Sequence, residues 1–297
     1  MESMHYESPA SVAEAVRLLA DAAPGSARVL AGGTDLLVQM RTGRIDPALV
    51  VDVKRIPETR GVAVRDGELV IGAALESVTL RGFPELGKRF PGLAEAAELI
   101  GSDQIQGRAS LGGNLCNASP AADTVPPLIA LGAQAEIAGP DGTRRVPVAE
   151  FVTGPGSTVL GRGEFLVSLH VPLPAARSAD AYLRLTPRTE MDIAVVGAAV
   201  NVTLDAGGTC TAARVVLGAV APTAIEVPDA AAALIGSTLD DAALARAGQA
   251  ATAACNPIDD MRGTIEYRRK VAAVLTRRAA AIAGERAERA EHATGRS

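Results

Sequence analysis

The spacing of apolar residues divides the start of the chain into short alternating elements. Apolar positions recur on one helical face over residues 12–19, and Ser11 with Glu14 has the spacing of a capping box. A short strand is expected at 28–31. It is followed by two glycines, a short helical pattern and the apolar run at 48–53. The order strand, glycine turn, helix and strand is typical of a βαβ-like unit.

From residue 61 the pattern changes to the alternation of β-strands. Asp66-Gly67 separates two short apolar runs and predicts a hairpin, and a second hairpin is expected over 133–148 around a Pro-Asp-Gly turn. Helices are expected at about 93–100 and, with prolines in its first turn, at 124–132. This middle region therefore mixes helices with antiparallel strands.

A strand over 163–174 ends in two prolines and a polar run, which is the best candidate for a domain boundary. Beyond it, residues 192–220 form the pattern of a long hairpin around Gly207-Gly208. Alanine-rich helical patterns follow near 228–235, 240–254 and 262–288.

Composition narrows the class of protein. A length of 297 residues with 48% hydrophobic content suits about two folded domains. With a net charge of −5, the chain has no basic field to hold nucleic acid or an anionic membrane. No apolar run reaches the roughly 20 residues of a membrane helix, and the acidic start does not look like a signal peptide, so we expect a cytoplasmic protein.

The cysteines and histidines do not suggest a metal site. The three cysteines are scattered without a CxxC pair, one fewer than a four-cysteine iron–sulfur cluster needs, and the three histidines form no HxxxH pair. His170 lies in an apolar strand and is expected to be a satisfied core or interface histidine. Any redox cofactor in this chain is therefore expected to be organic.

Two glycine-rich segments carry the candidate chemistry. Glycine lets backbone N–H groups approach a ligand closely, and a glycine turn that opens a helix is suited to bind phosphate, which describes Ala31–Leu36. The segment 110–123, SLGGNLCNASPAAD, adds Gly112 and Gly113, several neutral donors and Asp123 as an acceptor. Neither segment fits GxGxxG or GxxxxGK[ST], and each is also compatible with an ordinary turn or surface loop. The residues alone thus indicate a phosphate-binding site, suited to a nucleotide outside the Rossmann class.

The two segments together resemble the paired FAD signatures of a known family. AGGTDLL at 31–37 and ASLGGNLCNASPAAD at 109–123 are similar to those of the medium, flavoprotein subunit of molybdenum hydroxylases, the xanthine dehydrogenase and carbon monoxide dehydrogenase family. The resemblance continues through EMDIAVVGAAV at 190–200 and NPIDDMRGTIEYRRKVAAVLTRRA at 256–279. It therefore spans nearly the whole chain.

The resemblance implies an α+β fold. It implies a two-lobed PCMH-type FAD-binding domain over 1–176, with lobes at about 1–55 and 56–176. A carboxy-terminal flavoprotein domain over 178–285 is expected to have a three-stranded antiparallel sheet and a helical bundle. A frayed tail is expected at 286–297.

The resemblance also assigns cofactor contacts residue by residue. The first loop of the family wraps the FAD diphosphate, and the second lies against the isoalloxazine and diphosphate. Two apolar residues are placed against the flavin, and an acidic and a basic residue contact the FAD. In this sequence the corresponding residues are Val29, Leu30, Ala31, Gly32, Gly33, Thr34, Asp35, Leu36, Ile100, Ser110, Leu111, Gly112, Gly113, Asn114, Asp123, Leu166 and Arg184. Replacing Gly112 by valine is expected to abolish flavin retention by filling space that the cofactor needs.

The implied function is electron transfer. Members of the family pass electrons from molybdenum through two [2Fe–2S] clusters to FAD and then to an acceptor. This chain lacks the cluster cysteines, so it is expected to carry FAD only, with no catalytic acid–base pair and no metal. The molybdopterin cofactor and the two clusters are expected in a large and a small partner subunit, in a dimer of heterotrimers (a heterohexamer).

The sequence leaves the electron acceptor, the substrate of the complex and two other functions open. The electron acceptor is NAD, a quinone or a ferredoxin-like protein. The sequence AGGTDL in the first segment favours a purine, N-heterocycle or aldehyde as substrate of the complex. Two other functions are compatible with the sequence: a stand-alone NAD(P)H-dependent flavin reductase, and a flavin-free assembly subunit.

Overall fold

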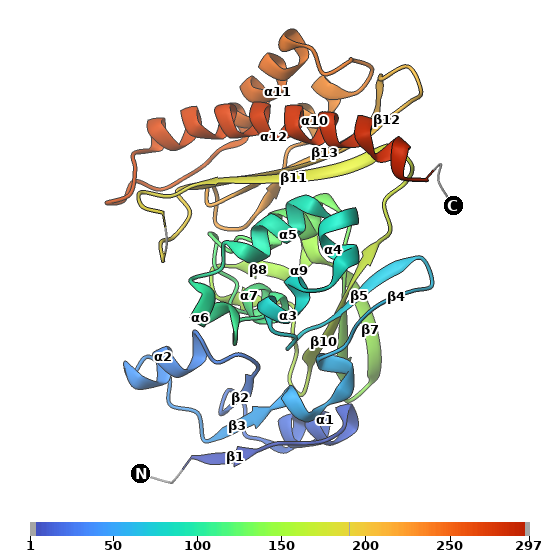
Figure 1. Ribbon diagram of the computed structural model, residues 1–297. Coiled ribbons are helices and arrows are strands. Elements are labelled where there is room, and N and C mark those ends of the chain that lie inside the picture. Colours follow the sequence, from blue (N-terminus) through green and yellow to red (C-terminus); the bar gives the residue numbers. More distant parts are fainter. Residues whose placement is uncertain (1–3, 190, 295–297) are drawn as a thin grey trace.

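The computed structural model describes residues 4–189 and 191–294. The chain forms three tiers, stacked in sequence order from the amino-terminal lobe through a central lobe to a carboxy-terminal domain (Figure 1). Three clusters of buried apolar residues fill the structure, and the cluster of the amino-terminal lobe also contains Ala138, Phe165 and Val167 of the central lobe. The α+β fold class is confirmed.

The first lobe is built on a small parallel sheet. Strands β1 (His5–Glu7), β3 (Leu49–Asp52) and β2 (Ala27–Leu30) lie in the order β1-β3-β2, and β3 pairs in parallel with both neighbours. Helix α1 (Val12–Asp21) begins at Ser11, whose side chain accepts a hydrogen bond from the Glu14 N–H at 3.3 Å. Helix α2 (Leu36–Arg41) lies between β2 and β3, as the strand–turn–helix–strand pattern predicted. Two 3₁₀ turns at Val53–Arg55 and Pro57–Thr59 complete the lobe.

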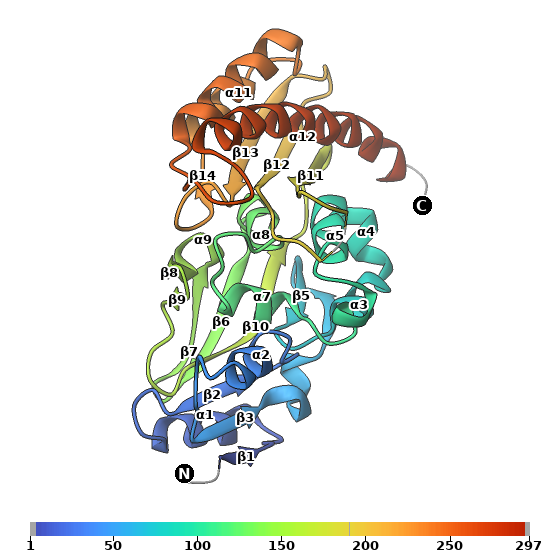
Figure 2. The same ribbon diagram turned by 90° about the vertical axis from the view of Figure 1, so that its left-hand side faces the viewer.

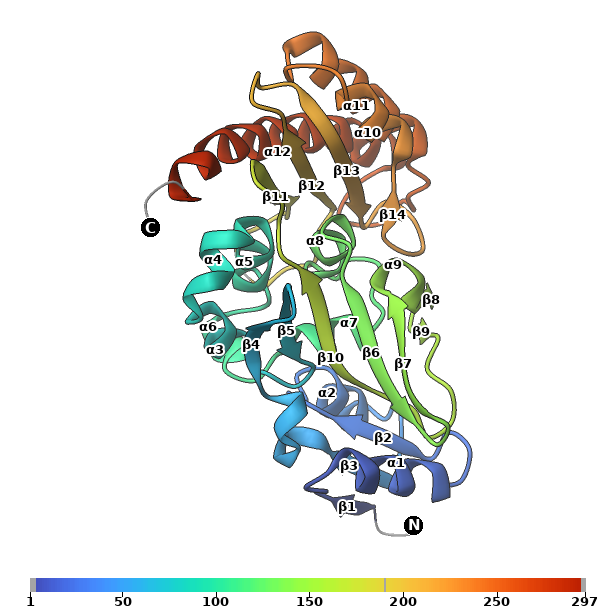
Figure 3. The same cartoon turned by 90° about the vertical axis from the view of Figure 1, so that its right-hand side faces the viewer.

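The central lobe is an antiparallel sheet packed against short helices. Its strand order is β4-β5-β10-β6-β7, and Figure 3 shows these strands side by side. Both predicted hairpins are present, as β4 with β5 and β6 with β7. The bounds of the strands are β4 (Val62–Arg65), β5 (Glu68–Gly72), β6 (Gln134–Gly139), β7 (Gly142–Pro147) and β10 (Phe165–Pro172), with the small pair β8 (Val152–Gly154) and β9 (Ser157–Thr158). The helices are α3 (Ser77–Arg81), α4 (Pro84–Arg89), α5 (Pro91–Glu98), α6 (Asp103–Gln106), α7 (Leu111–Cys116), α8 (Val125–Ala130) and α9 (Val148–Phe151).

The carboxy-terminal domain pairs an antiparallel sheet with long helices. Strands β11 (Ser178–Leu185), β12 (Val196–Leu204) and β13 (Cys210–Gly218) form the expected three-stranded sheet, and a two-residue strand β14 (Ile225–Glu226) adds a fourth. Helices α10 (Pro228–Leu234), α11 (Asp241–Ala254) and α12 (Ile265–Thr294) match the three predicted helical patterns. The boundary predicted near residue 177 falls between β10 and β11.

Helix α12 continues past the point where a frayed tail is expected. It runs to Thr294, and Ala287 is fully buried within the core of the carboxy-terminal domain. Arg286 also donates a hydrogen bond to the Asp180 carbonyl oxygen at 2.9 Å and forms an ion pair with Glu95 on α5. The folded part of the domain therefore extends beyond residue 285, because Arg286 contacts both β11 and the central lobe and Ala287 lies in the core. Residues 295–297 lie outside the described residues.

Successive side chains of β11 point alternately toward the core of the carboxy-terminal domain and toward the central lobe. Ala179 and Ala181 belong to the core beneath the long helices. Asp180, Tyr182 and Arg184 occupy the intervening positions and bond to groups of the central lobe. One strand thus joins the carboxy-terminal domain to the lobe that carries the second glycine-rich segment.

Among the described residues, no helix is both long and apolar enough to cross a membrane.

Candidate functional site

The two glycine-rich segments meet in the structure. Gly32 lies against the backbone just before the second segment, so closely that a Cβ built on it would lie 2.0 Å from the Arg108 carbonyl oxygen. Asn117 Nδ2 donates a hydrogen bond to Asp35 Oδ1 at 3.3 Å, and Gln39 Nε2 donates to Asn117 Oδ1 at 3.4 Å. Figure 2 shows α2, which follows the first segment, next to α7, which is part of the second. Two segments about 75 residues apart therefore form one site.

The first segment is a turn with free backbone donors. Val29 and Leu30 end β2, and Ala31–Asp35 lead into α2, which begins at Leu36. Gly33 has a φ of +79°, a left-handed conformation that side chains disfavour. Among the described residues, no oxygen accepts a hydrogen bond from the N–H groups of Gly32, Gly33, Thr34 or Asp35. A row of unpaired N–H groups is the donor set that a phosphate or diphosphate requires.

The second segment begins as a helix, where a loop was expected. Ser110 caps α7: its Oγ accepts a hydrogen bond from the Gly113 N–H at 3.0 Å. Two glycines lower the helix propensity of this segment, but burial of its apolar residues compensates, since Leu111 and Leu115 are both buried in the core of the central lobe. The cap and these two anchors explain why the polar segment does not remain irregular.

Gly112 is required for a different reason from the one inferred from the sequence. A Cβ on Gly112 would lie 2.4 Å from the Ala73 carbonyl oxygen and 2.6 Å from the Ala73 Cα. The space next to Gly112 is therefore occupied by the chain after β5, and not reserved for the cofactor. A larger residue at this position would push α7 away from the sheet.

Asp123 is held by two side chains from β11. Its Oδ1 accepts a hydrogen bond from the Tyr182 hydroxyl at 2.9 Å, and its Oδ2 is paired with Arg184 Nη1 at 2.5 Å. Burial raises the pKa of the Asp123 carboxyl to about 6, and the Arg184 charge limits that rise. Nearby, Asn114 Oδ1 accepts hydrogen bonds from the Thr124 N–H at 3.3 Å and hydroxyl at 2.7 Å, which fixes the chain next to Asp123.

The two expected apolar contacts lie in different surroundings. Ile100 is partly buried in the turn after α5, just before Gly101 with its φ of +61°. Leu166 is 4% exposed on β10, at an irregularity in the pairing with β6, and belongs to the core of the central lobe. Their contact with a flavin stays a prediction.

Two residues of this region were not singled out from the sequence. Asn117 bridges the two segments, and Tyr182 shares Asp123 with Arg184. The strand period gave a usable signal for Tyr182, because it lies two positions before Arg184 and so on the same face. Nothing local marks Asn117, whose partners come from residues about 80 positions earlier.

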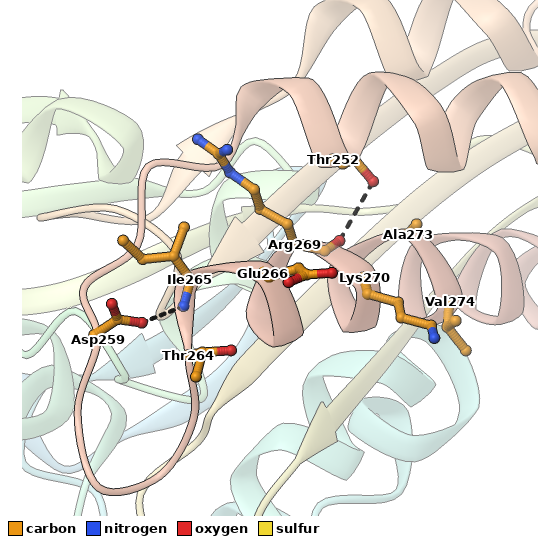
Figure 4. A pocket seen from close by; sticks show the side chains of 9 residues that line it. All are labelled: Thr252, Asp259, Thr264, Ile265, Glu266, Arg269, Lys270, Ala273 and Val274. Atoms are coloured by element: carbon orange, nitrogen blue, oxygen red, sulfur yellow. Dashed lines mark hydrogen bonds between the residues drawn. The ribbon is translucent and has the colours of Figure 1, made fainter.

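Other candidate features have structural roles or lie elsewhere. A groove between the end of α11 and the start of α12 is lined by Thr252, Asp259, Arg269 and Lys270, among others, and is remote from the two glycine segments (Figures 1 and 4).

His170 is buried, with Ser168 Oγ 2.9 Å from its Nε2 and Glu68 Oε2 2.9 Å from its Nδ1, so both ring nitrogens of the histidine have partners. In the described part of the chain, no three histidine, cysteine or acidic side chains are grouped to hold a metal ion.

Comparison with known proteins gives the same picture over the whole chain. Residues 2–174 match the family described as the FAD binding domain in molybdopterin dehydrogenase, and residues 181–283 match the CO dehydrogenase flavoprotein C-terminal domain. The chain is 36% identical to the carbon monoxide dehydrogenase medium chain of Hydrogenophaga pseudoflava, over 92% of this chain and 94% of that protein. It is 32% identical to the xanthine dehydrogenase FAD-binding subunit of Escherichia coli O157:H7, over 92% and 93%.

Solved structures agree with the sequence matches. A chain of the Cu,Mo-CO dehydrogenase, in its cyanide-inactivated form, superposes with a TM-score of 0.91 at 35% identity. The match covers 95% of this chain and 98% of that one, so both share the full arrangement of domains.

Proposed function

The chain belongs to the family of FAD-binding medium subunits of molybdenum hydroxylases, and from this premise we propose how its residues hold FAD and what it does in its complex. The subunit passes electrons from the iron–sulfur clusters of a small partner through FAD to an external acceptor. The two-electron chemistry is supplied by the flavin when it is bound, and this chain supplies binding and orientation.

The observation that carries the proposal is the row of free N–H groups at Gly32, Gly33, Thr34 and Asp35, next to the second segment. These donors bind the diphosphate of FAD. The close approach of Gly32 to the Arg108 backbone sets the separation of the two segments, and the Asn117 amide fastens them together. The site fits a dinucleotide because one turn offers donors to an anion while the second segment and β11 offer polar side chains to the rest of the molecule.

Asp123 acts as an acceptor for FAD, and Arg184 acts through it. Arg184 already uses Nη1 to hold Asp123, and its side chain is 6% exposed. The arginine thus keeps the Asp123 carboxylate ionised and oriented within a buried environment that would otherwise favour the protonated form. The residues of α7 and its cap that are proposed to lie against FAD are Ser110, Leu111, Gly112, Gly113 and Asn114, and Ile100 and Leu166 are the apolar neighbours proposed for the flavin ring.

The chain is the medium member of a multi-subunit enzyme, next to a large molybdenum subunit and a small iron–sulfur subunit. We extend this to a dimer of heterotrimers with a purine, N-heterocycle or aldehyde as substrate of the whole complex. The similarity to a protein named as a xanthine dehydrogenase subunit supports a purine substrate. In this sequence, the residues Thr34, Asp35 and Leu36 of the first segment support the same group of substrates. NAD, a quinone or a ferredoxin-like protein accepts the electrons, and the cytoplasmic location stays a prediction.

Purification of the complex from its native cell tests the function. We expect the full chain to copurify with a molybdenum subunit and an iron–sulfur subunit, and with one FAD per copy of this chain. Substrate added without oxygen is expected to bleach the flavin absorbance of the complex. A colourless chain that still joins the complex would show an assembly subunit, and multiple turnovers of NAD(P)H oxidation by the isolated chain would show a stand-alone reductase.

A further inference from the structure

A lysine side chain contacts the backbone of the first glycine turn. Lys54 belongs to the 3₁₀ turn that follows β3, and its ammonium group donates to the Ala31 carbonyl oxygen at 2.9 Å. Ala31 is the residue immediately before Gly32, the first of the free N–H donors. The lysine therefore bonds directly to the turn that binds the diphosphate.

The ammonium group is held in place from a second side. Lys54 Nζ donates to Asp52 Oδ1 at 2.8 Å, and the Tyr6 hydroxyl donates to Asp52 Oδ2 at 2.5 Å. Burial would raise the pKa of the Asp52 carboxyl, but the hydrogen bonds from Lys54 and Tyr6 keep it below its ordinary value. The carboxylate thus stays ionised and fixes the lysine, whose side chain is 22% exposed.

The position of this cluster in the sheet matters. Asp52 ends β3 and Lys54 follows it, while Leu30 ends the neighbouring parallel strand β2 and Ala31 follows it. Ligands of open sheets with parallel strands bind at the carboxyl ends of the strands. Lys54 is a cation placed at that edge, next to the turn proposed to hold an anion.

The hydrogen bond to Ala31 also reduces the repulsion between a backbone carbonyl oxygen and a bound phosphate. A turn that binds an anion through its N–H groups must keep its carbonyl oxygens directed elsewhere, because their partial negative charge repels phosphate. Lys54 holds the Ala31 carbonyl oxygen away from the N–H groups of the turn by donating a hydrogen bond to it. In the described part of the structure the ammonium group uses two of its three N–H donors, so one donor is available to a ligand, and the Asp52 carboxylate shares the positive charge.

We propose that Lys54 is a positioning residue for FAD: it orients the Ala31 turn and supplies the positive charge that partly neutralises the diphosphate. The proposal rests on the function proposed above. The charge acts at the site through one partly exposed group, and salt therefore screens it.

Titration of the flavin-free full chain with FAD tests the proposal. We expect Lys54→Met to raise the Kd for FAD roughly tenfold, the effect of losing one hydrogen-bonded charge. Lys54→Arg is expected to stay within about threefold of the wild type because the charge is retained. The Kd of the wild type is expected to rise with added sodium chloride, and the rise should be smaller for Lys54→Met.

Two controls separate this role from a structural one. Lys88→Met removes an exposed charge on α4 and should leave the Kd for FAD and its salt dependence unchanged. If Lys54→Met fails to fold because Asp52 is left unpaired, the double variant Lys54→Met with Asp52→Asn removes both charges and takes its place in the titration.

The possible results are distinguishable. A Lys54→Met protein, or the double variant, that binds FAD within threefold of the wild type would overturn the proposal, and so would an unchanged salt dependence. Failure of the wild-type chain to bind FAD at all would instead overturn the proposed function.

Discussion

Substitution of Gly32 by alanine is the sharpest perturbation of the proposed site. The added Cβ would lie 2.0 Å from the Arg108 carbonyl oxygen, 2.6 Å from its carbon and 3.1 Å from the Ala109 nitrogen. These distances are well short of van der Waals contact, and the atoms belong to backbone, which cannot rotate away. The two segments must therefore separate by more than about 1 Å, because overpacked sites relax by moving the backbone.

The size of the effect follows from the contacts that are lost. Overpacking costs about 1–3 kcal/mol of folding free energy, and a clash with backbone points to the upper end. If the shift removes the hydrogen bonds of two N–H groups to the diphosphate, at about 1.5 kcal/mol each or more, binding weakens by about 3 kcal/mol. The Kd for FAD is then expected to rise by more than about a hundredfold.

The assay combines urea unfolding of the flavin-free chain with an FAD titration followed by flavin fluorescence. Gly87→Ala is the matched control, since a Cβ there meets nothing within 4 Å outside its own helix. We expect that control to bind FAD normally and to gain up to about 1 kcal/mol from helix propensity. Normal FAD binding by Gly32→Ala would refute the inferred convergence of the two segments.

Three further predictions concern the side chains around the site and the domain junction. Asn117→Ala loses the hydrogen bond to Asp35 and is expected to weaken FAD binding roughly fivefold to tenfold in the same titration, with a smaller change in unfolding free energy. Tyr182→Phe removes a buried donor to Asp123 and should cost about 1–2 kcal/mol in urea unfolding, with an upward shift of the pKa of Asp123 measured by NMR. Burial raises the pKa of Asp180 from 3.8 to about 7, so between these pH values the folded state binds more protons than the unfolded state. The free energy of unfolding should therefore fall as the pH rises through this window, and urea unfolding at pH values on either side of it should show a smaller fall for Asp180→Asn. An equal fall in the variant and the wild type would contradict this prediction.

Much of the fold could be predicted from the sequence because its elements carry local signals. The glycine-containing turns between β4 and β5 and between β6 and β7 mark hairpins, and Ser11 with Glu14 marks the start of α1. Helix α7 was missed because its polar and glycine residues indicate a loop. Its stability comes from Leu111 and Leu115, whose burial depends on the tertiary structure.

The site itself shows where local signals end. The glycine pairs and Asp123 could be singled out, since their residue types suggest phosphate and hydroxyl binding. The reason for Gly112 could not be predicted, because its neighbour Ala73 is brought to it only by the fold. Lys54 was missed for the same reason: its partners Ala31 and Asp52 come from the ends of two parallel strands, and the pairing of those strands is not written in either segment.

A crystal structure of the full chain with FAD would show whether the Ala31–Leu36 turn and the distant segment 110–123 bind the cofactor together. We predict that the diphosphate accepts hydrogen bonds from the N–H groups of Gly32, Gly33, Thr34 and Asp35, next to α7. A diphosphate bound elsewhere, for example in the groove between α11 and α12 (Figure 4), with those N–H groups facing solvent, would contradict the proposed FAD site.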